Sequence, residues 1–245
     1  MNLIVDIGNT RAKAVVMSSM RVVESYVADS ATREWLGAIV GQHPEVSRAI
    51  VSSTRGDSQS CSAMLGEWLD FVVCFMPATT PIPLGNSYHT PQTLGADRLA
   101  AAVGASALYP DEDLMIVDFG TAITIDYVED GEFRGGNISP GVTIRFRSLA
   151  DYTACLPLCQ PTESVLEYGR TTVEAIEQGV MRGIEHEIRG YCYDFSKKNE
   201  KKRIIFTGGD AKYFAMRIKN AIFADCEPVI FGLNRILDYN AEKQE

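Results

Sequence analysis

Two short stretches of the chain combine residues that could hold phosphate groups and a cation. The first runs from Asp6 to Lys13 and begins Asp-Ile-Gly-Asn-Thr, and the second begins at Asp118 with Asp-Phe-Gly-Thr. A glycine in such a turn allows backbone N–H groups to approach a phosphate closely, and the hydroxyls of Thr10 and Thr121 can bond phosphate oxygens. Each aspartate could hold a cation that screens the phosphates. Together the stretches indicate a site for the phosphate tail of a nucleotide.

The two stretches belong to an internal repeat with an offset of 112 residues. The residues matched across the repeat are Ile4, Val5, Asp6 and Gly8 with Ile116, Val117, Asp118 and Gly120. Each copy reads as a buried apolar strand, a turn and a second β-rich run, and such copies half a chain apart indicate duplicated lobes. We therefore expect two similar lobes, 1–112 and 113–245, around a nucleotide cleft.

Two further motifs stand at expected helix starts. Thr207-Gly208-Gly209-Asp210 follows a predicted strand, and its glycines would allow a ribose or phosphate to approach the backbone. Asp97 and Arg98 lie near the start of another expected helix. An aspartate near a helix start is often only a favourable partner of the helix dipole. The functional alternative is that Asp97 accepts a hydroxyl proton while Arg98 holds an anion, and the sequence leaves both interpretations open.

The elements around these motifs alternate between strands and helices, which predicts an α/β fold. Asp130-Gly131 indicates a hairpin turn, whereas Gly135-Gly136 and Pro140-Gly141 indicate a loop. The strands expected beyond the first part of each repeat are Arg21–Val27, Ala49–Ser53, Phe71–Phe75 and Arg203–Phe206. The expected helices are Thr32–Val40, Ser58–Leu69, Gln92–Leu108, Thr143–Leu149, Thr172–Phe195 and Ala211–Asn220, and Lys197–Arg203 is expected to be a loop.

Composition and missing motifs exclude several functional classes. The 245 residues carry a net charge of −9, which argues against a general nucleic-acid partner. The sequence contains no P-loop, no Gly-x-Gly-x-x-Gly fingerprint, no His-Glu-x-x-His and no Gly-x-Ser-x-Gly elbow. Because no stretch reads as a secretory signal or membrane span, we expect a cytoplasmic protein with no membrane partner.

Taken in order, these motifs resemble those of the type III pantothenate kinases along nearly the whole chain. The stretches that carry the resemblance are Asp6–Thr10, Tyr88, Gly95–Arg98, Asp118–Ala122, Gly135-Gly136, Pro140-Gly141, Gly169–Thr172, Glu174-Ala175 and Thr207–Gly209. The resemblance implies an actin-like (ribonuclease H-like) fold. It also implies ATP-dependent phosphorylation of pantothenate to 4′-phosphopantothenate, the opening step of coenzyme A synthesis, with magnesium accompanying ATP.

The resemblance also implies roles for individual residues. Asp97 would be the catalytic proton acceptor, and Asp118 would bind a monovalent cation, potassium or ammonium. The implied ATP-binding residues are Asp6, Ile7, Gly8, Asn9, Thr10, Arg11, Ala12, Lys13 and Thr121. The implied pantothenate-binding residues are Tyr88, Gly95, Ala96, Asp97, Arg98 and Thr172. A homodimer is implied, with pantothenate near the subunit interface and the helix Thr172–Phe195 as the candidate interface. Arg11-Ala12-Lys13 and Asn137-Ile138-Ser139 depart from the commoner pattern of the family.

Two alternatives come from other functional classes. The duplicated turns alone would equally suit another actin-like small-molecule kinase, for sugars or acetate, or a phosphatase that cleaves polyphosphate or nucleotides. A non-catalytic protein that binds nucleotide and changes partners is the second alternative. The stretch Gly95–Arg98 favours a pantothenate kinase over the first, and the presence of Asp6, Asp97 and Asp118 argues against the second.

Overall fold

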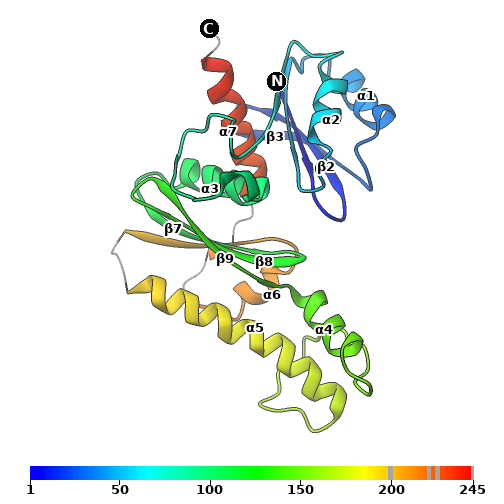
Figure 1. Ribbon diagram of the computed structural model, residues 1–245, viewed down its shortest axis with the longest axis vertical. Coiled ribbons are helices and arrows are strands. Elements are labelled where there is room, and N and C mark those ends of the chain that lie inside the picture. Colours follow the sequence, from blue (N-terminus) through cyan, green and yellow to red (C-terminus); the bar gives the residue numbers. More distant parts are fainter. Residues whose placement is uncertain (198–200, 220–221, 224–226, 244–245) are drawn as a thin grey trace. The chain divides into compact units, whose positions relative to one another are not determined.

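The computed structural model describes residues 1–197, 201–219, 222–223 and 227–243 (Figure 1). The chain forms two compact units. The first contains Met1–Asp111, Val128–Arg134 and the described residues from Glu227 onward. The second contains Glu112–Tyr127 and the described residues between Gly135 and Phe223. Both units combine strands with helices, so the predicted α/β class is confirmed.

The first unit is built on a five-stranded sheet of order β3-β2-β1-β4-β5. Strand β1 is antiparallel to β2 and parallel to β4; β2 is antiparallel to β3, and β4 is parallel to β5. The strands are β1 (Asn2–Ile7), β2 (Ala12–Ser18), β3 (Arg21–Ala28), β4 (Arg48–Ser53) and β5 (Phe71–Cys74). Strand β1 lies at the centre of the sheet, between β2 and β4. Its side chains alternate between the two faces of the sheet.

A second sheet has six strands and repeats this order as β9-β8-β7-β10-β11, with β6 (Gly85–Asn86) added beyond β9. Strand β7 is parallel to β10, as β1 is to β4, and β10 is parallel to β11. The strands are β7 (Asp113–Phe119), β8 (Ala122–Glu129), β9 (Glu132–Pro140), β10 (Lys202–Thr207) and β11 (Ile222–Phe223). Residues 114–119 show the same sequence of buried and half-buried positions as residues 2–7. The duplication predicted from the sequence is therefore present in the fold.

Helices cover both faces of the first sheet. Leu3, Val5 and Ile7 of β1 share a core with residues of α1 and α2, so the other face of β1 carries Ile4 and Asp6. Helix α7 packs against β1, β4 and β5 from that second face, and α3 packs against α7 and β4. The helices of this unit are α1 (Arg33–Gln42), α2 (Ser58–Leu65), α3 (Ala96–Leu108) and α7 (Pro228–Glu242). Asp6 is thus directed toward the helices that begin at Ala96 and Pro228.

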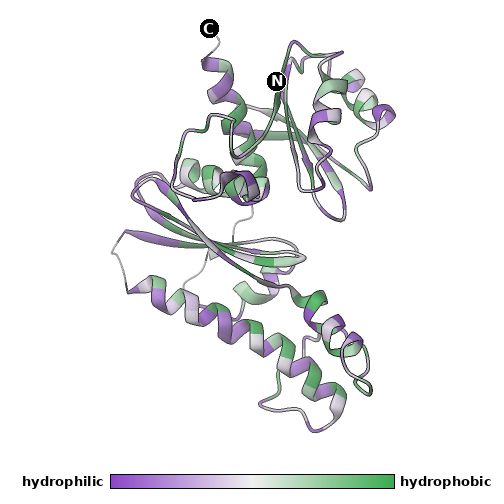
Figure 2. Ribbon diagram, in the orientation of Figure 1, coloured by the Kyte–Doolittle hydropathy of each residue, from purple (hydrophilic) through white to green (hydrophobic). Residues whose placement is uncertain are grey.

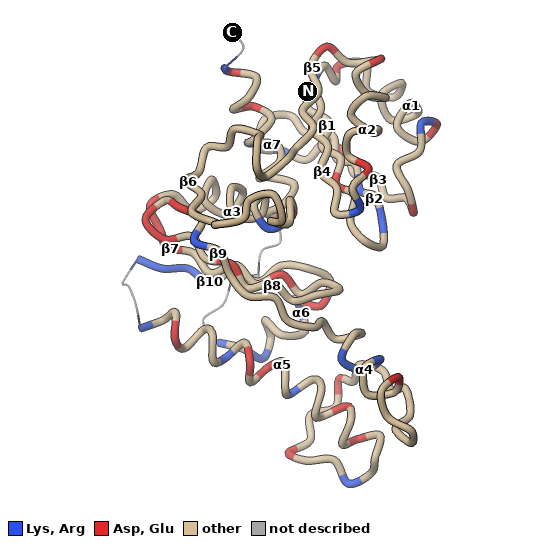
Figure 3. Tube along the Cα trace, in the orientation of Figure 1, with Lys and Arg blue, Asp and Glu red and all other residues tan. Residues whose placement is uncertain are grey.

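The second unit has one long helix and two shorter ones. They are α4 (Val142–Asp151), α5 (Thr172–Ser196) and α6 (Ala211–Ala215). Met115, Val117 and Phe119 of β7 share a core with buried residues of α5. Figure 2 shows hydrophobic and hydrophilic residues alternating along α5, as an amphipathic helix requires. Basic and acidic residues are interspersed along the same helix in Figure 3. Among the described residues, no helix combines the length and apolarity of a membrane span.

Helices α3 and α7 cross at two glycines. A Cβ on Gly232 would lie 1.8 Å from the Ala100 carbonyl oxygen and 2.8 Å from the Gly104 nitrogen. A Cβ on Gly104 would lie 2.0 Å from the Pro228 carbonyl oxygen. Only glycine permits backbones to approach this closely. Figure 1 shows α7, in red, against α3. The crossing fixes where the first residues of both helices lie.

Several predicted elements differ in extent from the observed ones. The helix predicted over Gln92–Leu108 begins only at Ala96, because a 3₁₀ turn, Pro91–Thr93, and the extended residue Leu94 precede it. The helix predicted over Ser58–Leu69 ends at Leu65. The helix predicted over Ala211–Asn220 ends at Ala215, and Asn220 itself lies outside the described residues, as do residues 198–200 of the predicted Lys197–Arg203 loop.

The loop predicted at Gly135-Gly136 is wrong, because both glycines lie within β9. Gly135 has a φ of 105°, and a Cβ on Gly136 would lie 2.0 Å from the Ile125 carbonyl oxygen of β8. The two glycines therefore serve a close approach between neighbouring strands rather than a loop. The hairpin turn predicted at Asp130-Gly131 is confirmed, with φ values of 55° and 71°. Strand β6 (Gly85–Asn86) pairs with the start of β9.

Candidate active site

The first predicted phosphate-binding stretch forms one strand–turn–strand unit. Strand β1 ends at Ile7 and β2 begins at Ala12, and the Gly8 N–H donates to the Arg11 carbonyl oxygen at 3.0 Å. Asp6 lies directly opposite Lys13 on the neighbouring strand. The eight residues from Asp6 to Lys13 are therefore brought together, as a loop that binds phosphates requires.

Asp6 is the acid of this turn, and its pKa is raised. Burial, followed by the negative charge of Asp97, raises the pKa of Asp6 from 3.8 to about 6; Glu227 adds to the rise, while the Ser52 hydroxyl and Lys13 oppose it. Asp6 and Asp97, far apart in the sequence, therefore lie within each other's field. The Asp6 Oδ1 atom is buried and has no hydrogen-bond partner in the described part of the chain. A buried carboxylate oxygen of this kind suits a cation such as magnesium arriving with nucleotide phosphates.

The raised pKa of Asp6 predicts a pH-dependent gain of stability on neutralising this residue. Ionised Asp6 is disfavoured in the folded chain, so the folded state gains stability as the pH falls through about 6 toward 3.8. Asp6→Asn is uncharged throughout. Its free energy of unfolding should exceed that of the wild type by about 1–3 kcal/mol near pH 8. The excess should shrink to about half a kcal/mol near pH 4, where Asp6 is protonated in the folded chain and about half protonated in the unfolded chain.

Urea unfolding of both proteins at the two pH values measures this difference. Asp70→Asn, at an exposed position of the same unit, is the matched control and should give no excess at either pH. An Asp6→Asn protein that is less stable than the wild type near pH 8 would contradict the prediction.

The predicted acceptor-binding residues gather at the start of α3. Gly95 is the N-cap residue, and a Cβ there would lie 2.5 Å from Asp97 Oδ1. Asp97 Oδ1 accepts a hydrogen bond from the Arg98 N–H at 2.9 Å. The Arg98 side chain is buried, and its guanidinium carbon lies 5.8 Å from the centre of the Tyr88 ring. The structure thus places Tyr88, Gly95, Ala96, Asp97 and Arg98 together in the first unit.

A pocket of about 450 Å³ adjoins this helix start. Its lining is uncharged and mixes hydroxyl, amide and apolar side chains. Gly95 and Ala96 form part of the wall, together with Ser53, Thr54, Gly56, Ser58, Gln59, Phe75, Met76, Pro77, Gln92, Thr93 and Leu94. A pocket of this composition suits a small, largely uncharged organic group.

The second predicted turn lies in the second unit and is shorter by two residues. The Gly120 N–H donates to the Ala122 carbonyl oxygen at 3.2 Å, and the Gly141 N–H donates to the Thr121 carbonyl oxygen at 3.1 Å. Strand β8 begins directly after Thr121. The shorter turn explains why the hydroxyls of Thr10 and Thr121 are out of step in the repeat.

The Thr207–Asp210 motif meets the Asp118 turn. A Cβ on Gly208 would lie 2.3 Å from Asp118 Oδ1 and 2.7 Å from the Phe119 carbonyl oxygen. The Asp210 N–H donates to the Phe119 carbonyl oxygen at 3.2 Å, and burial raises the pKa of Asp210. A carboxylate and a carbonyl oxygen at one place form a donor set that suits a hard cation. Within the described residues, no group of three or more His, Cys, Asp or Glu is arranged to hold a metal ion.

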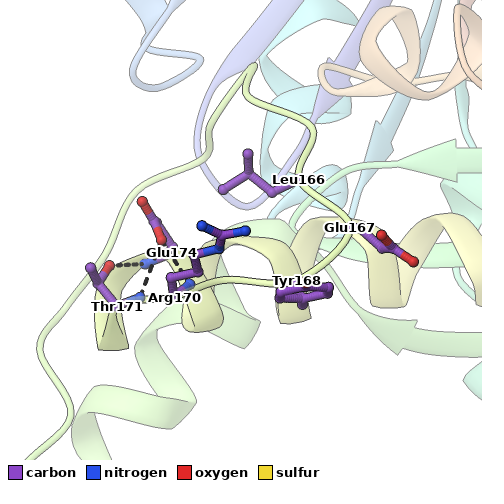
Figure 4. Close-up of a pocket in the computed structure, with 6 residues that line it drawn as sticks. All are labelled: Leu166, Glu167, Tyr168, Arg170, Thr171 and Glu174. Carbon is purple, nitrogen blue, oxygen red and sulfur yellow. Dashed lines mark hydrogen bonds between the residues drawn. The ribbon is translucent and has the colours of Figure 1, made fainter.

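Thr172 is the first residue of α5 and lies next to a second pocket of about 380 Å³ (Figure 4). Thr171 caps the helix, since its hydroxyl accepts from the Glu174 N–H while the Glu174 carboxylate accepts from the Thr171 N–H. A Cβ on Gly169 would lie 2.2 Å from the Ala175 nitrogen. The residues labelled in Figure 4 belong to the loop before α5 and to its first turn. The stretch Gly169–Thr172 therefore forms a rigid helix start.

The sequence analysis missed two residues beside Asp6, namely Ser52 and Glu227. Ser52 lies in register with Asp6, as Thr207 lies in register with Asp118. Extending the repeat to the fourth strand of each unit would have identified Ser52. Glu227 precedes α7 and forms an ion pair with Lys13. No local motif marks Glu227, because its partner lies 214 residues earlier in the chain.

Comparisons with solved structures bear on the fold. A Campylobacter jejuni protein of the Baf family matches with a TM-score of 0.62 and 24% identity, covering 98% of this chain and 99% of that chain. The activator of the 2-hydroxyisocaproyl-CoA dehydratase from Clostridium difficile, with bound ADPNP, matches with a TM-score of 0.53 and 16% identity, covering 99% and 96%. These likenesses, together with those to sugar kinases, confirm the predicted actin-like fold.

Sequence comparisons identify the family. The model of the type III pantothenate kinase family matches residues 2–194. A type III pantothenate kinase of Phocaeicola vulgatus is 40% identical over 241 residues, 98% of this chain and 99% of the relative. One of Porphyromonas gingivalis is 39% identical over 243 residues, 98% of each chain. The resemblance inferred from the motifs is thereby confirmed, and the chain belongs to the type III pantothenate kinase family.

Proposed function

We propose that this protein transfers the γ-phosphoryl group of ATP to the primary hydroxyl of pantothenate. The products are ADP and 4′-phosphopantothenate, so the reaction is the first step of coenzyme A biosynthesis. Family membership supports this assignment. The observation that carries it is the placement of the phosphate loop and the Asp97–Arg98 helix start in one unit, where Asp97 and Asp6 act on each other electrostatically.

Asp97 acts as the proton acceptor in this proposal. The acceptor hydroxyl gives its proton to the Asp97 carboxylate as its oxygen bonds to the γ-phosphorus. The bond from that phosphorus to the β,γ-bridging oxygen breaks, and ADP leaves. Phosphoryl transfer has a loose transition state, so the carboxylate mainly orients the hydroxyl. Arg98 is buried beside Tyr88 and suits the carboxylate of pantothenate through a two-pronged ion pair.

The remaining predicted residues bind ATP and cations. Asp6 to Lys13 and Thr121 hold the nucleotide, and the unpartnered Asp6 Oδ1 suits the magnesium that accompanies it. Asp118 holds the monovalent cation, with the Phe119 carbonyl oxygen close by. When bound, such cations offset the negative charge of the phosphates. Thr172 contacts pantothenate in this proposal.

The proposal includes a homodimer in the cytoplasm. Several apolar side chains between the end of α4 and the first turn of α5 are exposed, which supports a role of this part of the second unit in subunit contact. They include Tyr152, Leu158, Val165, Tyr168 and Val173, with Tyr152 exposed to 89% and Tyr168 to 62%. Sedimentation of the purified chain over a range of concentrations tests this assignment.

A coupled ADP-release assay tests the function and the cation together. Purified protein receives ATP, magnesium and pantothenate in separate reactions that contain a potassium, an ammonium or a sodium salt. We expect pantothenate-dependent ADP release in potassium or ammonium and much slower release in sodium, because the resemblance to the family implies a potassium or ammonium ion at Asp118. Equal rates in all three salts would remove the Asp118 cation from the proposal.

The choice of acceptor separates the alternatives. Phosphorylation of glucose or acetate in place of pantothenate would indicate another actin-like kinase. ADP release without any acceptor would indicate a phosphatase or ATPase. Binding of ATP with no transfer to any acceptor would indicate a nucleotide-dependent regulator. Formation of 4′-phosphopantothenate, detected by mass, is the result expected here.

A further inference from the structure

Lys13 and Asp6 lie directly opposite each other on the antiparallel strands β1 and β2. Opposed residues in such a pair direct their side chains to the same face, with Cβ atoms about 4.5–5.5 Å apart. The burial pattern agrees, because Ala12 and Ala14 on either side of Lys13 belong to the core on the other face. An ion pair between Lys13 and Asp6 is therefore within reach of the long lysine side chain.

The lysine nevertheless pairs with a different carboxylate. The Lys13 ammonium donates to Glu227 Oε1, while the buried Oδ1 of Asp6 has no partner among the described residues. The Lys13 side chain is 28% exposed and that of Glu227 is 53% exposed. The lysine is therefore engaged by Glu227, while Asp6 Oδ1 is left without a hydrogen bond and suits a nucleotide-bound cation.

Among the contacts of the described residues, the Glu227 side chain has no local role besides the ion pair with Lys13. Glu227 occupies the N-cap position of α7, yet its side chain makes no capping hydrogen bond. Glutamate is not among the preferred N-cap residues, which are Ser, Thr, Asp and Asn. The crossing of α3 and α7 at Gly104 and Gly232 holds the start of α7 in place, so Glu227 is anchored by the fold.

We propose that Glu227 is a positioning residue that holds the Lys13 ammonium away from Asp6, so that Asp6 Oδ1 stays available to the magnesium of the bound nucleotide. Among the described residues, four groups on the surrounding elements act on Asp6. They are Lys13 from β2, Ser52 from β4, Asp97 from α3 and Glu227 at the start of α7. Of these, Lys13 alone is cationic, so it alone could neutralise Asp6. This inference rests on the proposed nucleotide-dependent function.

The test measures ADP binding by titration calorimetry, with and without magnesium, in four proteins. These are the wild type, Glu227→Gln, Lys13→Met and the double variant. In Glu227→Gln the Lys13 ammonium loses its ion-pair partner and is free to pair with Asp6. The Kd for ADP with magnesium should then rise about fivefold, which is the size of effect expected from a partly exposed charge contact. Without magnesium the same variant should bind ADP at least as tightly as the wild type, because a negative charge has been removed.

The double variant gives the decisive comparison. Without Lys13 there is no cation to occupy Asp6, so adding Glu227→Gln to Lys13→Met should not weaken binding of ADP with magnesium. An equal loss in both backgrounds, or tighter binding of ADP with magnesium by Glu227→Gln, would overturn the inference. Glu227→Asp keeps the charge and should recover part of the affinity.

Two controls complete the design. Glu67→Gln breaks the exposed ion pair with Arg33 in the same unit and should leave ADP binding unchanged. Thermal unfolding of each variant tests for a merely structural role of Glu227, which would lower Tm without a magnesium-specific change in Kd. If the wild type binds ADP with magnesium but does not phosphorylate pantothenate, the proposed function fails, while the comparison of variants still decides this inference.

Discussion

The Asp97→Asn protein is expected to retain nucleotide binding and to lose about 10²–10⁴-fold in kcat, the range for removal of an oriented proton acceptor. The substitution preserves the local fold, because an asparagine Oδ1 can accept the Arg98 N–H bond that Asp97 now accepts. It also removes a negative charge near Asp6, so the pKa of Asp6 should fall. Loss of turnover therefore reflects the missing base rather than a displaced helix.

Steady-state kinetics with pantothenate and calorimetric titration with ADP measure the two properties separately. Asp70→Asn is the matched control, since Asp70 is an exposed aspartate of the same unit, and its kcat should equal that of the wild type. An Asp97→Asn enzyme with undiminished kcat would remove Asp97 from the mechanism and favour the interpretation as a helix-dipole partner.

Gly232→Ala is expected to destabilise the first unit strongly. The added Cβ would lie 1.8 Å from the Ala100 carbonyl oxygen, and backbone cannot yield as a flexible side chain can. Helices α3 and α7 must then separate. Overpacking of this kind costs about 1–3 kcal/mol and occasionally more, which lowers Tm by roughly 2–4 °C for each kcal/mol in a chain of this size.

Activity should fall together with stability in Gly232→Ala, because α3 carries Asp97 and α7 begins beside Glu227. Calorimetric unfolding and kcat measured below the transition check both effects. Gly41→Ala is the control. A Cβ on Gly41, in α1 of the same unit, would meet nothing within 4 Å, so this variant should unfold at or slightly above the wild-type temperature. A Gly232→Ala protein with wild-type Tm would show that α3 and α7 can move apart without loss of stability, which would contradict the prediction.

The strands were predictable because their signals are local and repeated. The apolar run that ends at Asp6 recurs before Asp118, and the matching burial of β1 and β7 follows from it. Glycine produced the clearest error. Gly135 and Gly136 were interpreted as a loop because they lack the side chains that mark a strand, and only the close approach of Ile125 on β8 explains them.

The site was predictable to the extent that its residues lie in local motifs. The Asp6–Lys13 turn and the Asp97–Arg98 helix start were both found from residue types and spacing. Their mutual proximity was expected only from the resemblance, since no periodicity links β1 to α3. Glu227 could not be found from the sequence, because a contact between residues 214 positions apart depends on the whole sheet and on the α3–α7 crossing.

The return of α7 to the first unit has a consequence for synthesis on the ribosome. Helix α7 packs against α3, β1, β4 and β5, all of which emerge before Asp111. Until α7 follows, the buried face of α3 around Ala100 and Gly104 lacks its covering helix. The first unit is thus translated early but completed late, and such contacts across long sequence separations slow folding. We expect nascent chains that stop before Pro228 to be bound by chaperones that recognise exposed apolar helices, and to be released once α7 is added.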